Sequence, residues 1–157
     1  MKIKALGAAT ILGSVSFFSA SSAFSETQLD VYKSPTCGCC AAWIDHVSAN
    51  GFDIHAHDTS DLNRIKLEQG IQPEVQSCHT AVSKDGYVFE GHVPAKFITR
   101  FLQDTPEGAL GLSTPGMPAG SPGMEMGSRF DPYSVVVMFK DGRLEQYESV
   151  TSQSSQY

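Results

Sequence analysis

Four cysteines are the residues of this 157-residue chain best suited to chemistry. Cys37, Cys39 and Cys40 lie together, and Cys78 lies far along the chain. If Gly38 begins a helix, the clustered sulfurs lie near unpaired backbone N–H groups and a positive dipole, which favour thiolates. Soft sulfur ligands select Cu(I), Zn(II) or iron–sulfur clusters, and structural zinc sites usually draw cysteines as two separated pairs. The crowding therefore favours Cu(I), with more than one ion, while zinc stays open.

Two other roles for the cysteines remain open. If the chain is exported, its even number of cysteines would usually form disulfides, here two structural bridges, although bridges confined to one corner would stabilise little. Cys37 and Cys40 also form the C-x-x-C pair of thiol–disulfide oxidoreductases. Against that activity, Cys39 would invite mispairing, Cys78 would be superfluous, and residues 76–80 lack the cis-proline that usually faces such a pair.

Further soft or imidazole donors could supplement the thiolates. His79 follows Cys78 directly, and Met117, Met124 and Met126 lie close together in a Gly/Pro-rich segment without the spacing of a helical core stripe. A lone histidine is more often a surface or hydrogen-bonded residue than a ligand. We therefore expect the remaining four histidines to be surface or hydrogen-bonded residues. They are His46, His55, His57 and His92.

The N-terminus has the pattern of a secretory signal peptide. Lys2 and Lys4 precede an apolar stretch from 5 to 20, and small residues follow at Ser21, Ala23 and Ser25. We expect residues 1–23 to be removed, with cleavage after 25 as the alternative, no stable membrane insertion afterwards, and a periplasmic location. Loss of the two lysines would take Lys plus Arg from 11 to 9 against 17 Asp plus Glu, so the formal net charge would fall from −6 to −8. Nucleic acid is then not an expected partner.

The remaining chain is predicted to form one domain over residues 26–150. Expected elements are strands at 29–34 and 52–57, helices at 38–50, 61–70 and 95–103, hairpins at 80–91 and 133–150, a long Gly/Pro/Met loop at 106–132, and a flexible tail at 151–157. The second helix carries Leu62, Ile65 and Leu67, and Asp61 is expected to cap it. A strand, a cysteine-containing turn at a helix N-terminus and a second strand predict an α/β, thioredoxin-like domain with a mixed sheet.

Four segments resemble the CopG-like periplasmic copper-resistance proteins, a family long catalogued as a domain of unknown function. They are YKSPTCGCCAAW at 32–43, SCHTA at 77–81, EGHVPA at 90–95 and GLSTPGMPAGSPGMEM at 111–126. The resemblance implies a thioredoxin-like fold in which Cys37, Cys39, Cys40 and Cys78 bind copper, as a cysteine-bridged polynuclear cluster. It selects copper over zinc, and we expect periplasmic copper-efflux or copper-carrier proteins as partners.

Overall fold

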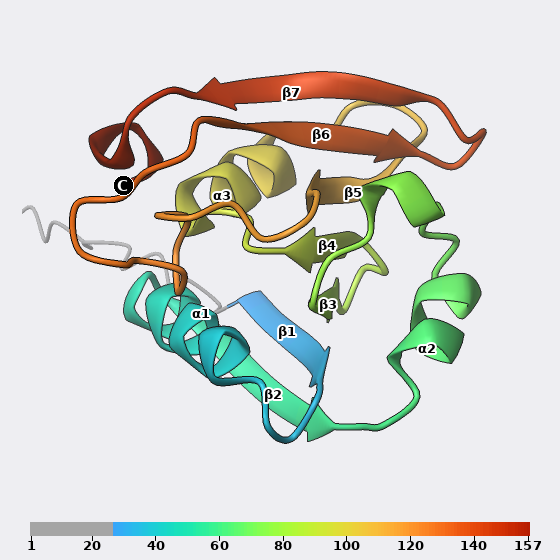
Figure 1. The fold of residues 1–157 in the computed structure, drawn as a ribbon. Coiled ribbons are helices and arrows are strands. Elements are labelled where there is room, and N and C mark those ends of the chain that lie inside the picture. The colour runs from blue at the N-terminus through green and yellow to red at the C-terminus, as the bar shows by residue number, and fades with distance from the viewer. Residues whose placement is uncertain (1–26) are drawn as a thin grey trace, which may run out of the picture.

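The computed structural model describes residues 27–157, so the predicted signal peptide lies outside the described residues. Within this range a seven-stranded mixed sheet is combined with three α-helices (Figure 1). The elements are β1 (Thr27–Lys33), α1 (Gly38–Ala49), β2 (Phe52–Asp58), α2 (Leu62–Glu68), the 3-10 turn η1 (Pro73–Val75), β3 (His79–Ser83), β4 (Val88–Gly91), α3 (Ala95–Gln103), β5 (Ala109–Thr114), β6 (Tyr133–Phe139), β7 (Leu144–Val150) and the 3-10 turn η2 (Gln153–Gln156). No helix in this part of the chain is long and apolar enough to cross a membrane.

The strands lie in the order β2-β1-β3-β4-β5-β6-β7. β1 and β2 are parallel and are joined by α1, as the strand–helix–strand pattern predicted. β3 runs antiparallel to both β1 and β4, and this places the start of β3 beside the end of β1. Because α1 begins shortly after β1 ends, the first turn of α1 and the first residues of β3 meet at one end of the sheet.

Helices cover both faces of the sheet. The larger core contains Trp43 and Val47 of α1 together with Phe97 and Phe101 of α3, packed against strand residues such as Leu112. The opposite face carries a smaller apolar cluster, which η1 covers and which consists of Ile71, Val75, Val88 and Met138. Figure 1 shows α1 and α2 on different sides of the strands. The sheet is therefore the middle layer of the domain.

The predicted long loop at 106–132 is wrong in its first part, because residues 109–114 form β5. This strand lies inside the sheet, parallel to β4 and antiparallel to β6. Gly111 obscured it in the sequence, since glycine normally weakens a strand. In the structure a Cβ at Gly111 would overlap the backbone carbonyl of Val88, so the close approach of β4 requires glycine there. The irregular parts of the predicted loop are residues 106–108 and 115–132.

Two further expectations differ from the structure. Leu67, an apolar residue of the second helix, is 72% exposed, whereas the charged Lys66 is buried. Asp61 occupies the N-cap position without a side-chain capping bond, because its carboxylate pairs with Arg64. The expected flexible tail contains η2, in which the fully buried Gln156 accepts a hydrogen bond from the Tyr133 hydroxyl.

Candidate metal centre

Three of the four cysteines lie at the N-terminus of α1. Cys37 occupies the N-cap position, and Cys39 and Cys40 belong to the first turn. A disulfide joins Cys37 to Cys40, whereas Cys39 and Cys78 are free. The structure thus contains one bridge rather than the two of the structural-disulfide alternative. The free Cys39 sulfur lies 3.5 Å from that of Cys37.

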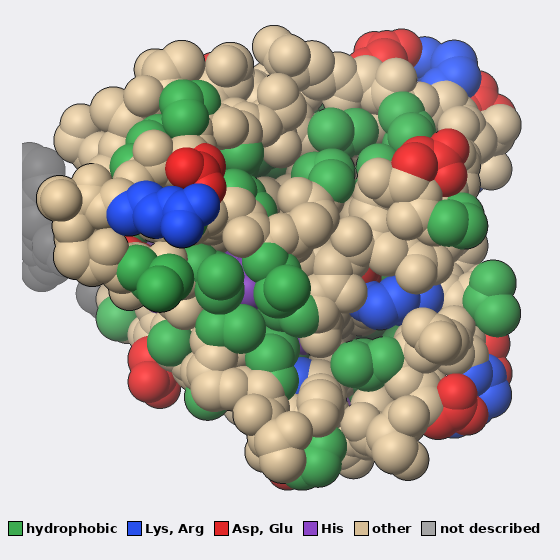
Figure 2. Space-filling view, viewed as in Figure 1, with side chains coloured by type: hydrophobic (Ala, Val, Ile, Leu, Met, Phe, Trp, Pro, Cys, Tyr) green, Lys and Arg blue, Asp and Glu red, His purple; other side chains and the backbone are tan. Residues whose placement is uncertain are grey.

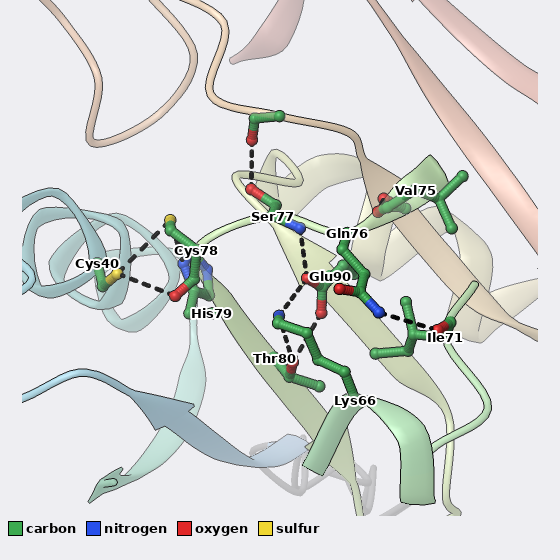
Figure 3. A network of polar contacts seen from close by, with 12 residues as sticks. Cys40, Lys66, Ile71, Val75, Gln76, Ser77, Cys78, His79, Thr80 and Glu90 are labelled. Atoms are coloured by element: carbon green, nitrogen blue, oxygen red, sulfur yellow. Dashed lines mark hydrogen bonds and ion pairs between the residues drawn. The ribbon is translucent and has the colours of Figure 1, made fainter. Parts of the chain in front are cut away.

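Cys78 supplies the fourth sulfur from a different part of the chain. It immediately precedes β3, and its Sγ lies 3.6 Å from the Sγ of Cys40 (Figure 3). The sulfur atoms of Cys37, Cys39, Cys40 and Cys78 all lie within 4.8 Å of one another. The antiparallel pairing of β1 with β3 explains this convergence, because it aligns the residue before β3 with the turn between β1 and α1. The structure therefore brings the sulfurs of all four sequence-predicted cysteines into one cluster, two of them joined in a disulfide.

Two histidines extend this cluster. The Nδ1 atom of His79 lies 3.3 Å from the Cys78 sulfur, and the Nε2 atom of His92 lies 3.0 Å from it. The donor atoms of Cys78, His79 and His92 form a second group within 4.8 Å of one another. The sequence interpretation left His92 among the ordinary histidines. The signal that could have identified it is the EGHVPA segment, which places His92 just beyond β4, next to the strand that begins with His79.

The two histidine rings differ in the partners of the nitrogen that faces away from Cys78. His92 Nδ1 donates to the carbonyl oxygen of Pro122 at 2.8 Å, which leaves the Nε2 lone pair of the neutral ring directed at Cys78. A second nitrogen bonded to a carbonyl in this way is typical of metal-binding histidines. His79 Nε2 is buried without a hydrogen-bond partner. Buried polar atoms are normally paired, so this orphan is chemically unusual.

Burial also controls the protonation of the donors. It lowers the pKa of His79 well below the ordinary histidine value, with the neighbouring His92 adding to the effect, and it lowers the pKa of His92. Both rings are therefore neutral near pH 7, which is the form that binds metals. Burial, reinforced by the nearby Cys39, raises the pKa of the Cys78 thiol to about 12. Cys78 must then lose a proton when it binds a metal.

The segment 115–132 packs onto this cluster. Gly123 has a φ of +83°, and a Cβ there would lie 2.7 Å from the carbonyl oxygen of Cys39 and 2.6 Å from the amide nitrogen of Trp43. Together with the Pro122–His92 bond, this contact fixes the segment against the first turn of α1 (Figure 1). In Figure 2 a small histidine surface is surrounded by side chains of the hydrophobic class, which there includes cysteine, methionine and proline.

The methionines predicted as extra donors lie in the same segment. Met124 is half-buried and directly follows Gly123, whereas Met117 and Met126 are 57% and 63% exposed. Met124 is thus next to the backbone that touches α1, and the other two thioethers face solvent. A role for any of the three in holding metal stays a prediction.

These features define an α/β protein with a cluster of thiol and imidazole donors at one end of its sheet, a donor set suited to a soft metal. Two solved structures, named "Copper resistance protein copG- Form 2" and "Copper resistance protein copG- Form 1", are each 40% identical to this chain. Their TM-scores are 0.75 and 0.74, and the matches cover 79% of this chain and 98% and 97% of theirs. The family described as "Protein of unknown function, DUF411" matches residues 75–124. A comparison with curated proteins gave no match. The chain belongs to the CopG-like family of copper resistance proteins.

Proposed function

We propose that this protein is a periplasmic copper-binding protein that holds Cu(I) in a thiolate site and contributes to copper resistance or copper redox handling. The observation that carries the proposal is the convergence of the sulfurs of Cys37, Cys39, Cys40 and Cys78 within 4.8 Å. Membership of a family whose solved members are named copper resistance proteins supports copper as the metal.

The crowding of the thiols supports a cluster with more than one copper ion. Cys39 and Cys40 are adjacent in one helical turn, so they cannot approach a single ion as independently as two separated pairs can. Cu(I) is satisfied by few sulfurs and accepts thiolates that bridge two ions, which suits this arrangement. His79 and His92 would supply neutral imidazoles on the Cys78 side, and Met124, next to the backbone that contacts α1, is the candidate thioether.

Reduction must precede metal binding by all four cysteines. In the disulfide, the sulfurs of Cys37 and Cys40 are bonded to each other and cannot act as thiolates. A dithiol reductant, itself oxidised to a disulfide, would transfer two electrons and two protons to this bridge and give two thiols, and their deprotonation would complete the set. The site would therefore couple thiol redox state to copper capacity.

Location, fold family and partners are part of the same proposal. The basic, apolar and small-residue pattern of residues 1–25 supports export to the periplasm. The parallel strand–helix–strand unit carrying the C-x-x-C pair, followed by the β3–β4 hairpin and α3, supports a thioredoxin-like core. Periplasmic copper-efflux or copper-carrier proteins are the proposed recipients of the metal.

Competition for Cu(I) tests the proposal. The reduced protein is titrated with Cu(I) against a competing chelator, alongside Cys78→Ser and the control His55→Gln, which changes an exposed donor on β2. We expect tight binding by the wild type and by His55→Gln, and a large loss in Cys78→Ser. Absence of tight binding by the wild type, or unchanged binding by Cys78→Ser, would contradict the proposal.

A thiol–disulfide oxidoreductase is the second candidate, because the Cys37–Cys40 disulfide lies at the N-terminus of α1. Such an enzyme would exchange this disulfide with substrate thiols. Two further thiols close to the bridge, Cys39 and Cys78, would compete with the substrate. An insulin-reduction assay separates the two functions, since rapid turnover without copper would favour the enzyme.

A further inference from the structure

We propose that the buried ion pair between Lys66 and Glu90 positions Cys78 for metal binding from the opposite face of the sheet. The inference rests on the proposed function, because Cys78 is one of the four thiols proposed to hold copper. Lys66 comes from α2 and Glu90 from β4. Neither is offered as a ligand, and both would act through the backbone on either side of Cys78.

The Glu90 carboxylate is the centre of the network (Figure 3). Its Oε1 accepts hydrogen bonds from the Lys66 ammonium and, at 2.6 Å, from the backbone N–H of Ser77. Its Oε2 accepts a hydrogen bond from the Thr80 hydroxyl at 2.7 Å, and Lys66 also donates to that hydroxyl oxygen at 3.0 Å. The side chains of Lys66 and Glu90 are 4% and 0% exposed, so water does not compete for these bonds.

The two groups bound by Glu90 lie on either side of Cys78 in the chain. Ser77 immediately precedes Cys78, and Thr80 follows it by two residues and pairs with Glu90 across β3 and β4. The segment is also confined from the β4 side, since a Cβ on Gly91 would lie 2.5 Å from the Ser77 Cβ. One carboxylate thus holds the backbone N–H before Cys78 and the Thr80 side chain after it, while the thiol itself reaches α1.

The position of this backbone determines where the thiol lies. The Cys78 carbonyl oxygen is 3.8 Å from the Cys40 sulfur, and the two sulfurs are 3.6 Å apart. A displacement of about 1 Å is enough to impair a metal or catalytic site whose supporting groups are lost. Groups outside the ligand set that orient ligands typically change metal affinity by about 10- to 100-fold when they are mutated.

Stability alone is a poor explanation for this ion pair. A buried ion pair is often no more stabilising than apolar residues of similar volume, because both charges must leave water. An apolar pair at positions 66 and 90 would fill the same space, but it would offer no acceptor for the Ser77 N–H. The acceptor oxygen of Glu90 is therefore the part of the network that apolar packing cannot replace.

Two double variants separate positioning from packing. Lys66→Met/Glu90→Leu removes both charges and the acceptor. Lys66→Met/Glu90→Gln removes both charges but keeps an amide oxygen that can accept from Ser77, and so it serves as the conservative rescue. Removing both charges together avoids leaving one charge buried without a partner. Arg64→Gln/Glu68→Gln, which removes an exposed ion pair of the same helix, is the matched control.

Two quantities are measured on the reduced proteins, namely Cu(I) affinity by chelator competition and, without copper, the alkylation rate of Cys78 relative to Cys39. We expect Lys66→Met/Glu90→Leu to bind Cu(I) about 10- to 100-fold more weakly and to show faster relative alkylation of Cys78. The glutamine variant should recover most of both losses, and the exposed-pair control should behave as the wild type.

The proposal is overturned if the leucine variant matches the wild type in both measurements, or if the glutamine variant loses as much as the leucine variant. Should circular dichroism show the leucine variant to be unfolded, Thr80→Val replaces it, and unchanged copper affinity and alkylation in that variant would overturn the proposal. If the wild type itself binds no Cu(I), the proposed function fails, while the alkylation rates still decide whether Glu90 positions Cys78.

Discussion

Cys78 belongs to both donor groups of the described chain, the four-sulfur group and the group it forms with His79 and His92. Its sulfur, just before β3, also contacts the Cys40 sulfur of α1 at 3.6 Å. At the scale of single residues, the site is therefore a set of thiols on one side and a pair of buried neutral rings on the other. Cys78 lies between them.

His92 offers the most direct test at this scale. We expect His92→Gln to weaken Cu(I) binding about 10- to 100-fold, because the variant loses both the Nε2 lone pair at 3.0 Å from Cys78 and the hydrogen bond to Pro122. His55→Gln is the matched control on an exposed histidine. Chelator competition measures the change. Equal affinities of the two variants would show that His92 does not contribute to copper binding.

At the scale of elements, the site depends on how the 115–132 segment meets α1. Gly123 allows its backbone to approach Cys39 and Trp43 closely, and its positive φ is one that other residues rarely adopt. The neighbouring Pro122 carbonyl then holds His92. The segment is thus both a cover for the cluster and a means of orienting one ring.

Gly123→Ala should disrupt this junction. The added Cβ would overlap the backbone of α1, so we expect a loss of about 1–3 kcal/mol in the free energy of unfolding, together with weaker Cu(I) binding. Gly127→Ala is the control, because that glycine also has a positive φ, +62°, but a Cβ there meets nothing within 4 Å. Denaturant unfolding measures both variants. Equal losses would show that backbone strain, rather than contact with α1, causes the effect.

A pH effect is expected where α1 meets α3. His46 Nε2 accepts a hydrogen bond from the backbone N–H of Ala95 at 3.1 Å, and burial lowers the pKa of His46 below the ordinary value of 6.5. The folded state therefore binds this proton less readily than the unfolded state, so the stabilising contribution is complete above pH 6.5 and is lost as pH falls below it. Protonation would also place a positive charge at the N-terminus of α3.

His46→Gln checks this effect, because glutamine can accept the same bond without titrating. Between about pH 7.5 and 5.5, we expect the wild type to lose on the order of 1 kcal/mol more unfolding free energy than the variant, the usual worth of one such hydrogen bond. Denaturant unfolding at several pH values measures the difference. Parallel curves for the two proteins would contradict it.

At the scale of the whole molecule, the number of free thiols tests whether the cysteines serve only as structural disulfides. Protein purified without reductant should contain one disulfide, Cys37–Cys40, and two free thiols, Cys39 and Cys78. Reduction should raise the thiol count to four and increase the Cu(I) capacity. Thiol labelling with mass spectrometry measures the count and the connectivity. Two bridges and no free thiol would instead support a domain stabilised only by disulfides.

Much of the fold could be predicted from the sequence, and the elements that were missed depend on long-range contacts. The strand–helix–strand unit, both hairpins and α3 were predicted because their apolar periodicities and turn residues are local signals. β5 was missed because the close approach of Val88, which requires Gly111, is a long-range contact. The burial of Lys66 in α2 was not predicted for the same reason, since it depends on Glu90, a residue far along the chain.

For the candidate site, cysteine spacing and family resemblance identified the four thiols, and the structure brings them together. His92 was not singled out, because its proximity to Cys78 depends on the β3–β4 register and on the Pro122 carbonyl. The packing of the C-terminal residues could not be predicted either, because nothing in the polar segment 151–157 indicates the burial of Gln156. A side chain that is fixed by distant partners cannot be inferred from its own neighbours.

The docked C-terminal residues matter for how this protein is purified. Gln156 donates a hydrogen bond to the carbonyl oxygen of Gly120, and the Tyr157 hydroxyl donates to Glu125, which lies between Met124 and Met126. A polyhistidine affinity tag fused after Tyr157 would therefore begin beside the segment that packs on the cysteine cluster. Its imidazoles would compete for copper and inflate the apparent stoichiometry, so copper titrations of this protein call for a cleavable tag that contains no histidine.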